Sequence, residues 1–463
     1  MKNNNSQDAN HWINNFIIAV QGALYRPTQN WLPNFILSVI LVCGPVSQWV
    51  RVSKETNRYR KFYHQIGKLG TCDHRYQDKF AAWTIQEILA LVKDATRVCL
   101  AGDDTPIRRY GPKVEGTGWQ FHESNGNHND DKFYGHSLVV LSLIVEHPRW
   151  GTLSIPLRNQ IYVCQKDLDK IDAQRRPKFQ TMREMLIDMV KAVLPELKKA
   201  GKPIELLFDR GYVSKTVFES LREENVEVVT RFKSNMNLYE LPTPAPGKRG
   251  RPRKYGNGLK MNDIISDDKT YPVNCQRVQM YGRETLVEYK TAVLTSHVSD
   301  GHPIRIVVSR LVDLKVMPDK SIVKSASPWG LFVSTNTTLT PSEILKSYSE
   351  RFSIEEMFKD LKEVCGLGKQ QVRNFASNKA VIDLTLTGFA LVERWSWNRS
   401  DHFLTSHRAP WDNTTRRPSH KSKRMAMQLE LLWQNYSAEY AEILNPKILR
   451  ALKSSLFDRI LCS

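Results

Sequence analysis

The feature that most constrains the fold is the order of apolar runs between residues 98 and 232. Residues 98–102 form a short apolar run that is followed by two acids, and residues 204–208 form another that ends at Asp209. Short apolar runs bounded by polar residues are typical of buried strands. The expected order is three strands (98–102, 133–145, 153–163), an amphipathic helix (177–200), a strand (204–208), a helix (214–224) and a strand (226–232). This order predicts an α/β fold in which helices cover a mixed sheet.

The regions around this block predict the domain organisation. Between about residues 234 and 327 the regular pattern gives way to short strand-like runs, so we expect an inserted, mostly β subdomain. The core resumes at residues 329–334 and continues into a helix. The chain is helical before and after the core, and a basic polar loop at 406–424 interrupts the second helical region. The expected units are therefore 1–95 (helical), 96–375 (core with its β-rich insertion) and 376–463 (helical).

The most apolar segment of the chain, residues 31–46, does not indicate a membrane span. It is shorter than the roughly 20 residues that a transmembrane helix needs. It is also interrupted by prolines, a glycine and an asparagine: Pro33, Asn34, Gly44 and Pro45. We therefore expect a buried helix of the N-terminal domain and no membrane partner.

The charge of the chain favours nucleic acid as a partner. Lysine and arginine total 67 against 48 acids in 463 residues, which gives a net charge of +19. An excess of this size indicates a polyanion, with an anionic membrane or an indifferent cationic surface as alternatives. The seven cysteines are scattered without a C-x-x-C pair, which argues against disulfides and cysteine zinc sites and fits a reducing cytoplasm. No G-x-x-x-x-G-K-[ST] loop is present in the sequence, so ATP use is not expected.

Residues 348–362 predict a helix with a chemically mixed edge. At about 100° per residue, four side chains lie within roughly 60° of one another on this helix. They are Tyr348, Arg351, Glu355 and Lys362. A separate apolar sector faces the core and contains Ile354, Met357, Phe358 and Leu361. Since a carboxylate can ligate a metal and the other three groups can bind phosphates, this edge suits an enzyme that cuts a nucleic-acid backbone.

Three acids occupy special places in this arrangement. Asp103 or Asp104 ends the first expected strand, Asp209 ends a later one, and Glu355 lies on the helix after the sheet. Acids at strand ends point into the crevice where α/β proteins bind ligands. Carboxylates that meet there repel one another unless a cation is present, and hard oxygen ligands select Mg²⁺ or Mn²⁺. Two such ions, about 4 Å apart, can clamp both oxygens of a displacement at phosphorus. Taken singly, each acid has a structural alternative as a turn former, helix cap or solvated residue.

The spacing on the helix resembles the Y-R-E-K signature of bacterial insertion-sequence transposases with a DDE triad. The resemblance implies a ribonuclease-H-like catalytic core with a β-rich insertion before the glutamate helix. It also implies DNA transposition with two Mg²⁺ ions, with Glu355 as a metal ligand. The other three helix residues, Tyr348, Arg351 and Lys362, are implied to contact the backbone of the transposon ends.

Two aspartate motifs extend the resemblance. The pair Asp209-Arg210 is similar to the family's second-aspartate motif, and residues 103–105 are similar to its first. Asp103 fits the pattern D-x-T, whereas Asp104 fits if the strand register differs by one residue. A shift of one residue turns the side chain to the opposite face of the sheet, so the two positions are not equivalent. We take Asp103 as the first acid and keep Asp104 as the alternative.

A basic segment at residues 248–254 is a second DNA-binding candidate. Its Arg-Gly-Arg-Pro core resembles an AT-hook, in which arginines enter a narrow minor groove. A solvated basic hairpin is the alternative. The candidate DNA contacts outside the helix are therefore Arg210, Lys248, Arg249, Arg251, Arg253 and Lys254.

These observations predict a metal-dependent DDE transposase that cleaves element ends and joins their 3′-hydroxyls to target DNA. Asp103, Asp209 and Glu355 are the predicted catalytic acids and metal ligands. The expected partner is double-stranded DNA, bound by a homodimer or larger synaptic complex in the bacterial cytoplasm, at the nucleoid. Two alternatives remain: a ribonuclease-H-like nuclease or resolvase without strand transfer, and a non-catalytic DNA-binding regulator.

Overall fold

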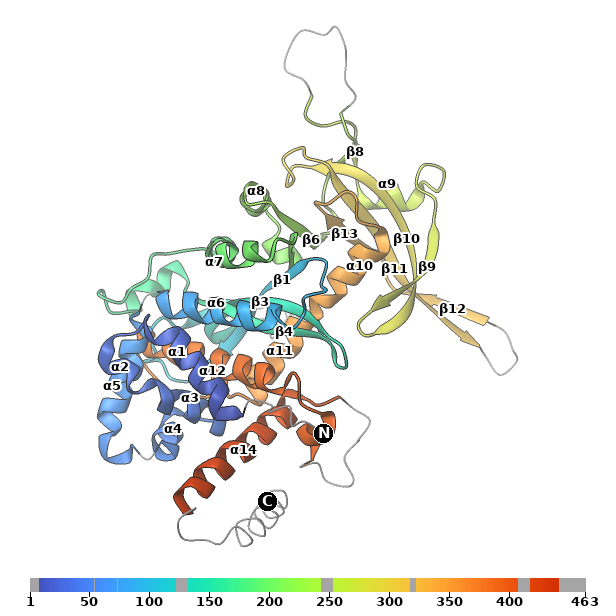
Figure 1. The fold of residues 1–463 in the computed structure, drawn as a ribbon. Coiled ribbons are helices and arrows are strands. Elements are labelled where there is room, and N and C mark those ends of the chain that lie inside the picture. The colour runs from blue at the N-terminus through green and yellow to red at the C-terminus, as the bar shows by residue number, and fades with distance from the viewer. Residues whose placement is uncertain are drawn as a thin grey trace.

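The expected sheet is present in the computed structural model, which describes residues 8–53, 55–72, 74–121, 132–242, 253–316, 322–406 and 417–440. Its central strands follow the order β4-β3-β1-β5-β6 (Figure 1). They are β1 (Val98–Arg108), β3 (Lys132–His147), β4 (Gly151–Tyr162), β5 (Ile204–Phe208) and β6 (Val226–Phe232). β3 is antiparallel to both of its neighbours, whereas β1, β5 and β6 are parallel. This is the ribonuclease-H-like mixed sheet that the sequence predicted.

Burial on both faces explains the continuous apolar runs of these strands. All five residues of β5 are buried, and β3 is buried along most of its length. Helices α7 (Met182–Leu197) and α8 (Lys215–Glu223) cover one face. Helix α11 (Phe352–Glu363) packs on β1 and β4 with its apolar side. α7 starts later than the expected helix because Thr181 forms a capping box with Glu184.

The β-rich insertion extends the same sheet. Its elements are β7 (Leu238–Tyr239), β8 (Gly258–Leu259), α9 (Met261–Ser266), β9 (Asn274–Met280), β10 (Arg283–Ser296), β11 (Ile304–Val316) and β12 (Ile322–Ala326). β13 (Gly330–Ser334) then returns beside β6 and pairs with both β6 and β11. In Figure 1 the insertion projects to the side of the sheet away from the N-terminal helices. A short strand β2 (Gly118–Phe121), which the sequence did not predict, pairs with the start of β3.

Helices from both ends of the chain pack into one block. The N-terminal helices are α1 (Ala9–Gln21), α2 (Arg26–Gln29), α3 (Leu32–Leu41), α4 (Val46–Val52), α5 (Tyr59–Gly70) and α6 (Arg75–Leu89). The C-terminal helices are α12 (Phe375–Ser396), α13 (Asp401–Thr405) and α14 (His420–Tyr440). Tyr76 on α6 shares a hydrogen bond with Thr387 on α12 at 2.9 Å, and Gln77 donates to Asp383 at 2.8 Å. The two terminal regions therefore share a core.

α12 is the central helix of this block. It is long and apolar enough to cross a bilayer, but 94% of its most apolar window is buried inside the protein. α2, α3 and α4 would also pass as a broken span, with a bend of 110° between residues 26–41 and Val46–Val52. The apolar run 31–46 is thus not one helix, because α3 ends at Leu41 and Pro45 precedes α4. Most of α3 is buried, as expected.

The basic loop expected at 406–424 is shorter than predicted. Residues 407–416 lie outside the described part of the chain, but α14 already begins at His420. His420, Lys423 and Arg424 are buried, with exposed fractions of 4%, 2% and 4%. These basic residues therefore belong to the helical block.

Candidate active site

Two of the predicted acids follow the last paired residues of neighbouring parallel strands. The parallel pairing of β1 with β5 ends at Gly102 and Phe208, and Asp103 and Asp209 come directly after these residues. The carboxyl ends of parallel strands meet at one edge of a sheet, so the two acids lie at the same edge. β1 itself does not end there. It continues to Arg108 through pairing with β3, so the expectation that the first acid ends its strand is wrong.

The alternation of side chains along β1 separates Asp103 from Asp104. Gly102 faces α7, since a Cβ atom at Gly102 would lie 2.4 Å from Cδ1 of Leu186. Asp104 accepts a hydrogen bond at 3.1 Å from Tyr212 Oη. Successive strand residues point to opposite faces, so Asp103 points to the face covered by α11. The structure therefore gives the two aspartates different surroundings.

Arg351 lies where two helices meet. The predicted single helix over 348–362 is in fact two, α10 (Pro341–Glu350) and α11, with Arg351 between them. The amide of Arg351 bonds to the carbonyl of Tyr348 at 3.3 Å, and that of Ile354 bonds to the carbonyl of Arg351 at 3.0 Å. Both bonds span three residues instead of four, so the backbone tightens at this position.

The guanidinium of Arg351 joins two of the three predicted acids. Its Nη1 lies 2.7 Å from Asp103 Oδ2, and its Nη2 lies 2.7 Å from Glu355 Oε1. Tyr348 Oη donates to Asp209 Oδ1 at 3.3 Å, and the guanidinium of Arg351 lies over the Tyr348 ring at 5.5 Å. Residues from β1, from the end of β5 and from both helices thus form one network.

Burial determines the ionisation of this network. It raises the pKa of Asp103 to about 7, against the opposing effect of Arg351, and the nearby Asp104 and Asp209 raise it further. Burial alone would lower the pKa of Arg351, but Asp103 raises it above its usual value. Burial also raises the pKa of Tyr348 to about 12. At neutral pH, Arg351 and Tyr348 are therefore both protonated hydrogen-bond donors to the acids.

The three acids have the chemistry of a divalent metal site. Carboxylate oxygens are the ligands that Mg²⁺ and Mn²⁺ prefer. The side chain of Asp103 is 17% exposed and has a cation, Arg351, as its partner, whereas Glu355 is 43% exposed and thus open to solvent. Within the described ranges, no group of three His, Cys, Asp or Glu side chains has the spacing of a metal cage. The carboxylates are thus of the kind that a divalent ion prefers, but they do not have the spacing of a metal site here, because the guanidinium of Arg351 lies between Asp103 and Glu355.

The remaining predicted DNA contacts lie outside this network or could not be placed. Lys362 is half-buried on α11, where burial and the nearby Arg108 lower its pKa. Arg210 is half-buried at the start of a 3₁₀ turn, Arg210–Tyr212. Arg253 is exposed, and Lys254 Nζ lies 2.6 Å from Asp300 Oδ1. Lys248, Arg249 and Arg251 lie outside the described residues.

Sequence reasoning missed Tyr212. Its side chain is buried and reaches from the turn after Asp209 to Asp104. Burial raises its pKa well above the usual range, so the hydroxyl stays protonated and donates a hydrogen bond to Asp104. A tyrosine three residues after Asp209 was a local signal, but only the alternation of β1 shows which aspartate it reaches.

Comparison with known families gives one match. Residues 31–289, more than half of the chain, match the model of the family described as DDE superfamily endonuclease. The match includes Asp103 and Asp209 and ends before α10 and α11, which carry Arg351 and Glu355. No curated protein matches the chain.

Proposed function

This chain belongs to the DDE superfamily endonucleases, and we propose that within this family it acts as a DNA transposase. The family membership makes it a nuclease-type enzyme with DNA as its substrate and divalent metal ions as its cofactors. The finer proposal is that it binds the ends of a bacterial insertion sequence, cleaves them and joins the 3′-hydroxyls to target DNA.

One observation carries the proposal. Arg351, at the junction of α10 and α11, contacts both Asp103 and Glu355, and Tyr348 contacts Asp209. The residues of the Y-R-E-K spacing thus lie against the two aspartates that follow β1 and β5. Bringing several carboxylates together in a partly buried place costs stability. Their grouping beside this helix edge therefore favours a functional role over a structural one.

In the proposed mechanism, Asp103, Asp209 and Glu355 would hold two divalent ions, with Mg²⁺ preferred and Mn²⁺ as a substitute, and the chemistry supplied there would be activation of water or a 3′-hydroxyl and stabilisation of the leaving oxygen. Tyr348 orients Asp209 by donating a hydrogen bond from its hydroxyl group. Arg351 holds two carboxylates together and can contact a phosphate when DNA enters, because a guanidinium binds carboxylate and phosphate in the same way.

The partners follow from this function. We propose that the protein acts as a homodimer or larger complex that pairs two double-stranded DNA ends at the bacterial nucleoid in the cytoplasm, away from membranes. The N-terminal helices would recognise the end sequence and the C-terminal helices would support pairing. The basic residues of segment 248–254, together with Lys362 and Arg210, would contact the DNA backbone, with an affinity that falls as salt rises.

Strand transfer is the test that separates this function from its alternatives. The assay uses short duplexes that end in pre-cleaved terminal sequence from the DNA flanking the gene, a supercoiled target plasmid and Mg²⁺. A transposase joins the duplexes to the plasmid, and an Asp209→Asn variant does not. Cleavage of flanking DNA without joining would indicate a nuclease or resolvase, and no cleavage with intact DNA binding would indicate a regulator.

A further inference from the structure

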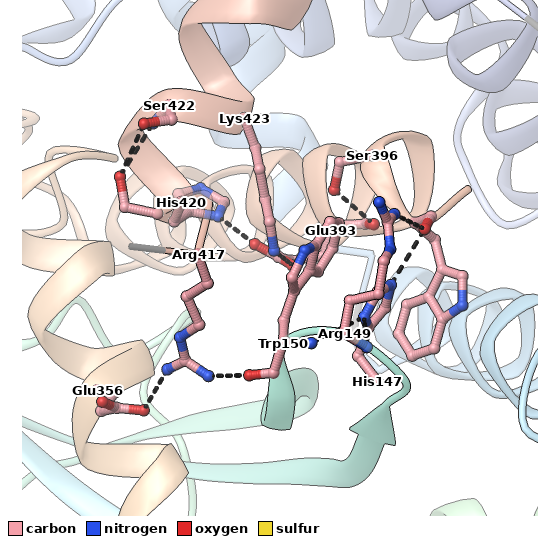
Figure 2. Close-up of polar contacts among 12 residues, drawn as sticks. His147, Arg149, Trp150, Glu356, Glu393, Ser396, Arg417, His420, Ser422 and Lys423 are labelled. Carbon is pink, nitrogen blue, oxygen red and sulfur yellow. Dashed lines mark hydrogen bonds and ion pairs between the residues drawn. The ribbon is translucent and has the colours of Figure 1, made fainter. Parts of the chain in front are cut away.

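The segment from Arg417 to Arg424 connects the C-terminal helix to the helix that carries Glu355. It was expected to be part of a polar loop, yet three of its five basic side chains are buried: His420, Lys423 and Arg424. Figure 2 shows His420 and Lys423 at Glu393, with Trp150 beside them, and Arg417 at Glu356. Because buried charges are costly without partners, their contacts indicate what the segment does.

Glu393 on α12 is the centre of this cluster. Its Oε1 lies 2.7 Å from His420 Nδ1, and its Oε2 lies 2.6 Å from Lys423 Nζ (Figure 2). The His420 ring stacks on Phe389 at 4.0 Å, and Lys423 Nζ lies 3.9 Å from the centre of the Trp150 ring. A carboxylate that is 3% exposed thus binds two cations of α14.

The same segment contacts α11 and the two residues that follow it. Arg417 Nη2 lies 3.2 Å from Oε2 of Glu356, the residue next to Glu355 (Figure 2). At the other end of the helix, Arg424 donates to the carbonyl of Val364 and His420 Nε2 lies 3.3 Å from Cys365 Sγ. A cation at the carbonyl end of a helix is favourable, because the helix dipole is negative there.

The segment is itself held firmly in the helical block. Arg424 also donates to the carbonyls of Val39 and Ile40 on α3, both at 2.9 Å. Gln428, one turn further along α14, donates to the carbonyl of Ile40 at 2.8 Å. α11 is thus held between β4 on one side and a C-terminal segment that is fixed to α12 and α3.

We propose that Arg417, His420 and Arg424 are positioning residues of the active site, which fix α11 and thereby the place of Glu355. The C-terminal region then has a role in catalysis within each subunit, in addition to any role in pairing. This inference rests on the proposed site around Asp103, Asp209 and Glu355, but it does not require strand transfer.

The charges of the cluster suit such a role near neutral pH. Burial alone lowers the pKa of His420, but Cys365 and Glu393 raise it to about 9. Burial raises the pKa of Glu393, but Lys423 and His420 bring it down to about 2. At pH 7, His420 is therefore protonated and Glu393 ionised, so both groups of the ion pair are charged.

The test reverses the ion pair between Arg417 and Glu356 and then restores it with exchanged charges, whereas the hydrogen bond from Arg417 to the Trp150 carbonyl is lost in both variants. Arg417→Glu places two carboxylates side by side, and Arg417→Glu with Glu356→Arg recreates the pair with exchanged charges. Arg417 and Glu356 are 43% and 50% exposed, so folding should survive both changes. Lys421→Glu is the matched control, because it makes the same charge change at an exposed position four residues along the chain, in the first turn of α14.

Mn²⁺-dependent nicking of plasmid DNA gives the first readout, and hydrogen exchange of the α11 amides gives the second. We expect Arg417→Glu to lower kcat about fivefold, in line with the strength of an exposed ion pair. The DNA concentration that gives half-maximal nicking should stay unchanged. The exchanged pair should recover most of this loss, and α11 should exchange faster in Arg417→Glu than in Lys421→Glu. Equal nicking and equal α11 exchange in Arg417→Glu and Lys421→Glu would overturn the proposal, as would failure of the exchanged pair to recover.

The outcome can be separated from that of the proposed function. A protein that nicks DNA without joining ends would refute transposition and leave this test intact. If the wild-type protein does not nick DNA, the exchange of α11 amides alone decides the matter.

Discussion

Replacing Arg351 should tighten metal binding while it abolishes cleavage. The guanidinium lies 2.7 Å from one oxygen of Asp103 and 2.7 Å from one oxygen of Glu355, so an ion bound by the same carboxylates must displace it or lie beside it. Charges of +2 and +1 about 5 Å apart repel by about 2 kcal/mol even at the screening of water. Arg351→Gln removes this repulsion, so its Mn²⁺ affinity should rise on the order of tenfold. Cleavage should still be lost, because nothing then holds the acids together or contacts the phosphate.

The assay is a titration of the full-length protein with Mn²⁺, followed by electron paramagnetic resonance. Arg351→Lys, which keeps the charge, is the matched control and should bind Mn²⁺ as the wild type does. Asp103→Asn gives the background from other sites. The titration belongs at about pH 8.5, above the Asp103 pKa of about 7, so that protons do not compete with the metal. Unchanged or weaker Mn²⁺ binding by Arg351→Gln would refute the competition between guanidinium and metal.

Three further predictions concern single side chains. Asp103→Asn should reduce DNA cleavage by roughly a thousandfold or more, because it removes an essential metal ligand. Asp104→Asn should reduce cleavage only about tenfold, because it disturbs the hydrogen bond from Tyr212. Equal losses in a cleavage assay would contradict the choice of Asp103 as the metal ligand. Because burial raises the folded-state pKa of Asp103 from 3.8 to about 7, its stabilising contribution is complete below about pH 4 and is lost as the pH rises through 7. The free energy of unfolding of Asp103→Asn, measured with urea, should therefore fall less than that of the wild type between about pH 4 and 7. The same pH profile for both proteins would contradict the raised pKa of Asp103. Lys290→Met should lower the free energy of unfolding by about 3 kcal/mol, seen by thermal denaturation, because it leaves two carbonyls of α9 and Asp268 without the buried ammonium.

The strands and acids of the core could be predicted because their signals are local. β5 is a run of five buried residues that ends where an acid begins, and β1 starts with the same pattern. When two such runs form parallel strands, the residues that follow them lie at the same edge of the sheet. The proximity of Asp103 and Asp209 could therefore be predicted without knowing any contact between distant parts of the chain. The coarse fold and part of the site are therefore present in the pattern of the chain.

Other features depend on contacts that no local pattern contains. β1 continues past two acids and a proline to Arg108 because β3 supplies the pairing partners for Asp103–Arg108. The break at Arg351 falls in a stretch without glycine or proline, so helical periodicity predicts one unbroken helix. The burial of Lys423 depends on Glu393, which lies on another helix. In each case a partner that is distant in sequence decides the local structure.

The position of β13 explains how an acid beyond a long insertion reaches the site. The insertion leaves the core after β6 and returns with β13, whose residues 331–334 pair with residues 229–232 of β6. The chain therefore re-enters the sheet beside the strand from which it departed, whatever the length of the intervening segment. α10 then packs against β9, β13 and β6, and Arg351 at its end contacts Asp103. Loop closure costs grow only slowly with length, so such an insertion is tolerated as long as this one pairing is kept. Disrupting the β6–β13 pairing should therefore displace Glu355, as should loss of the contact between Tyr281, in the β9–β10 turn, and Phe352 at the start of α11 (ring centres 5.9 Å apart).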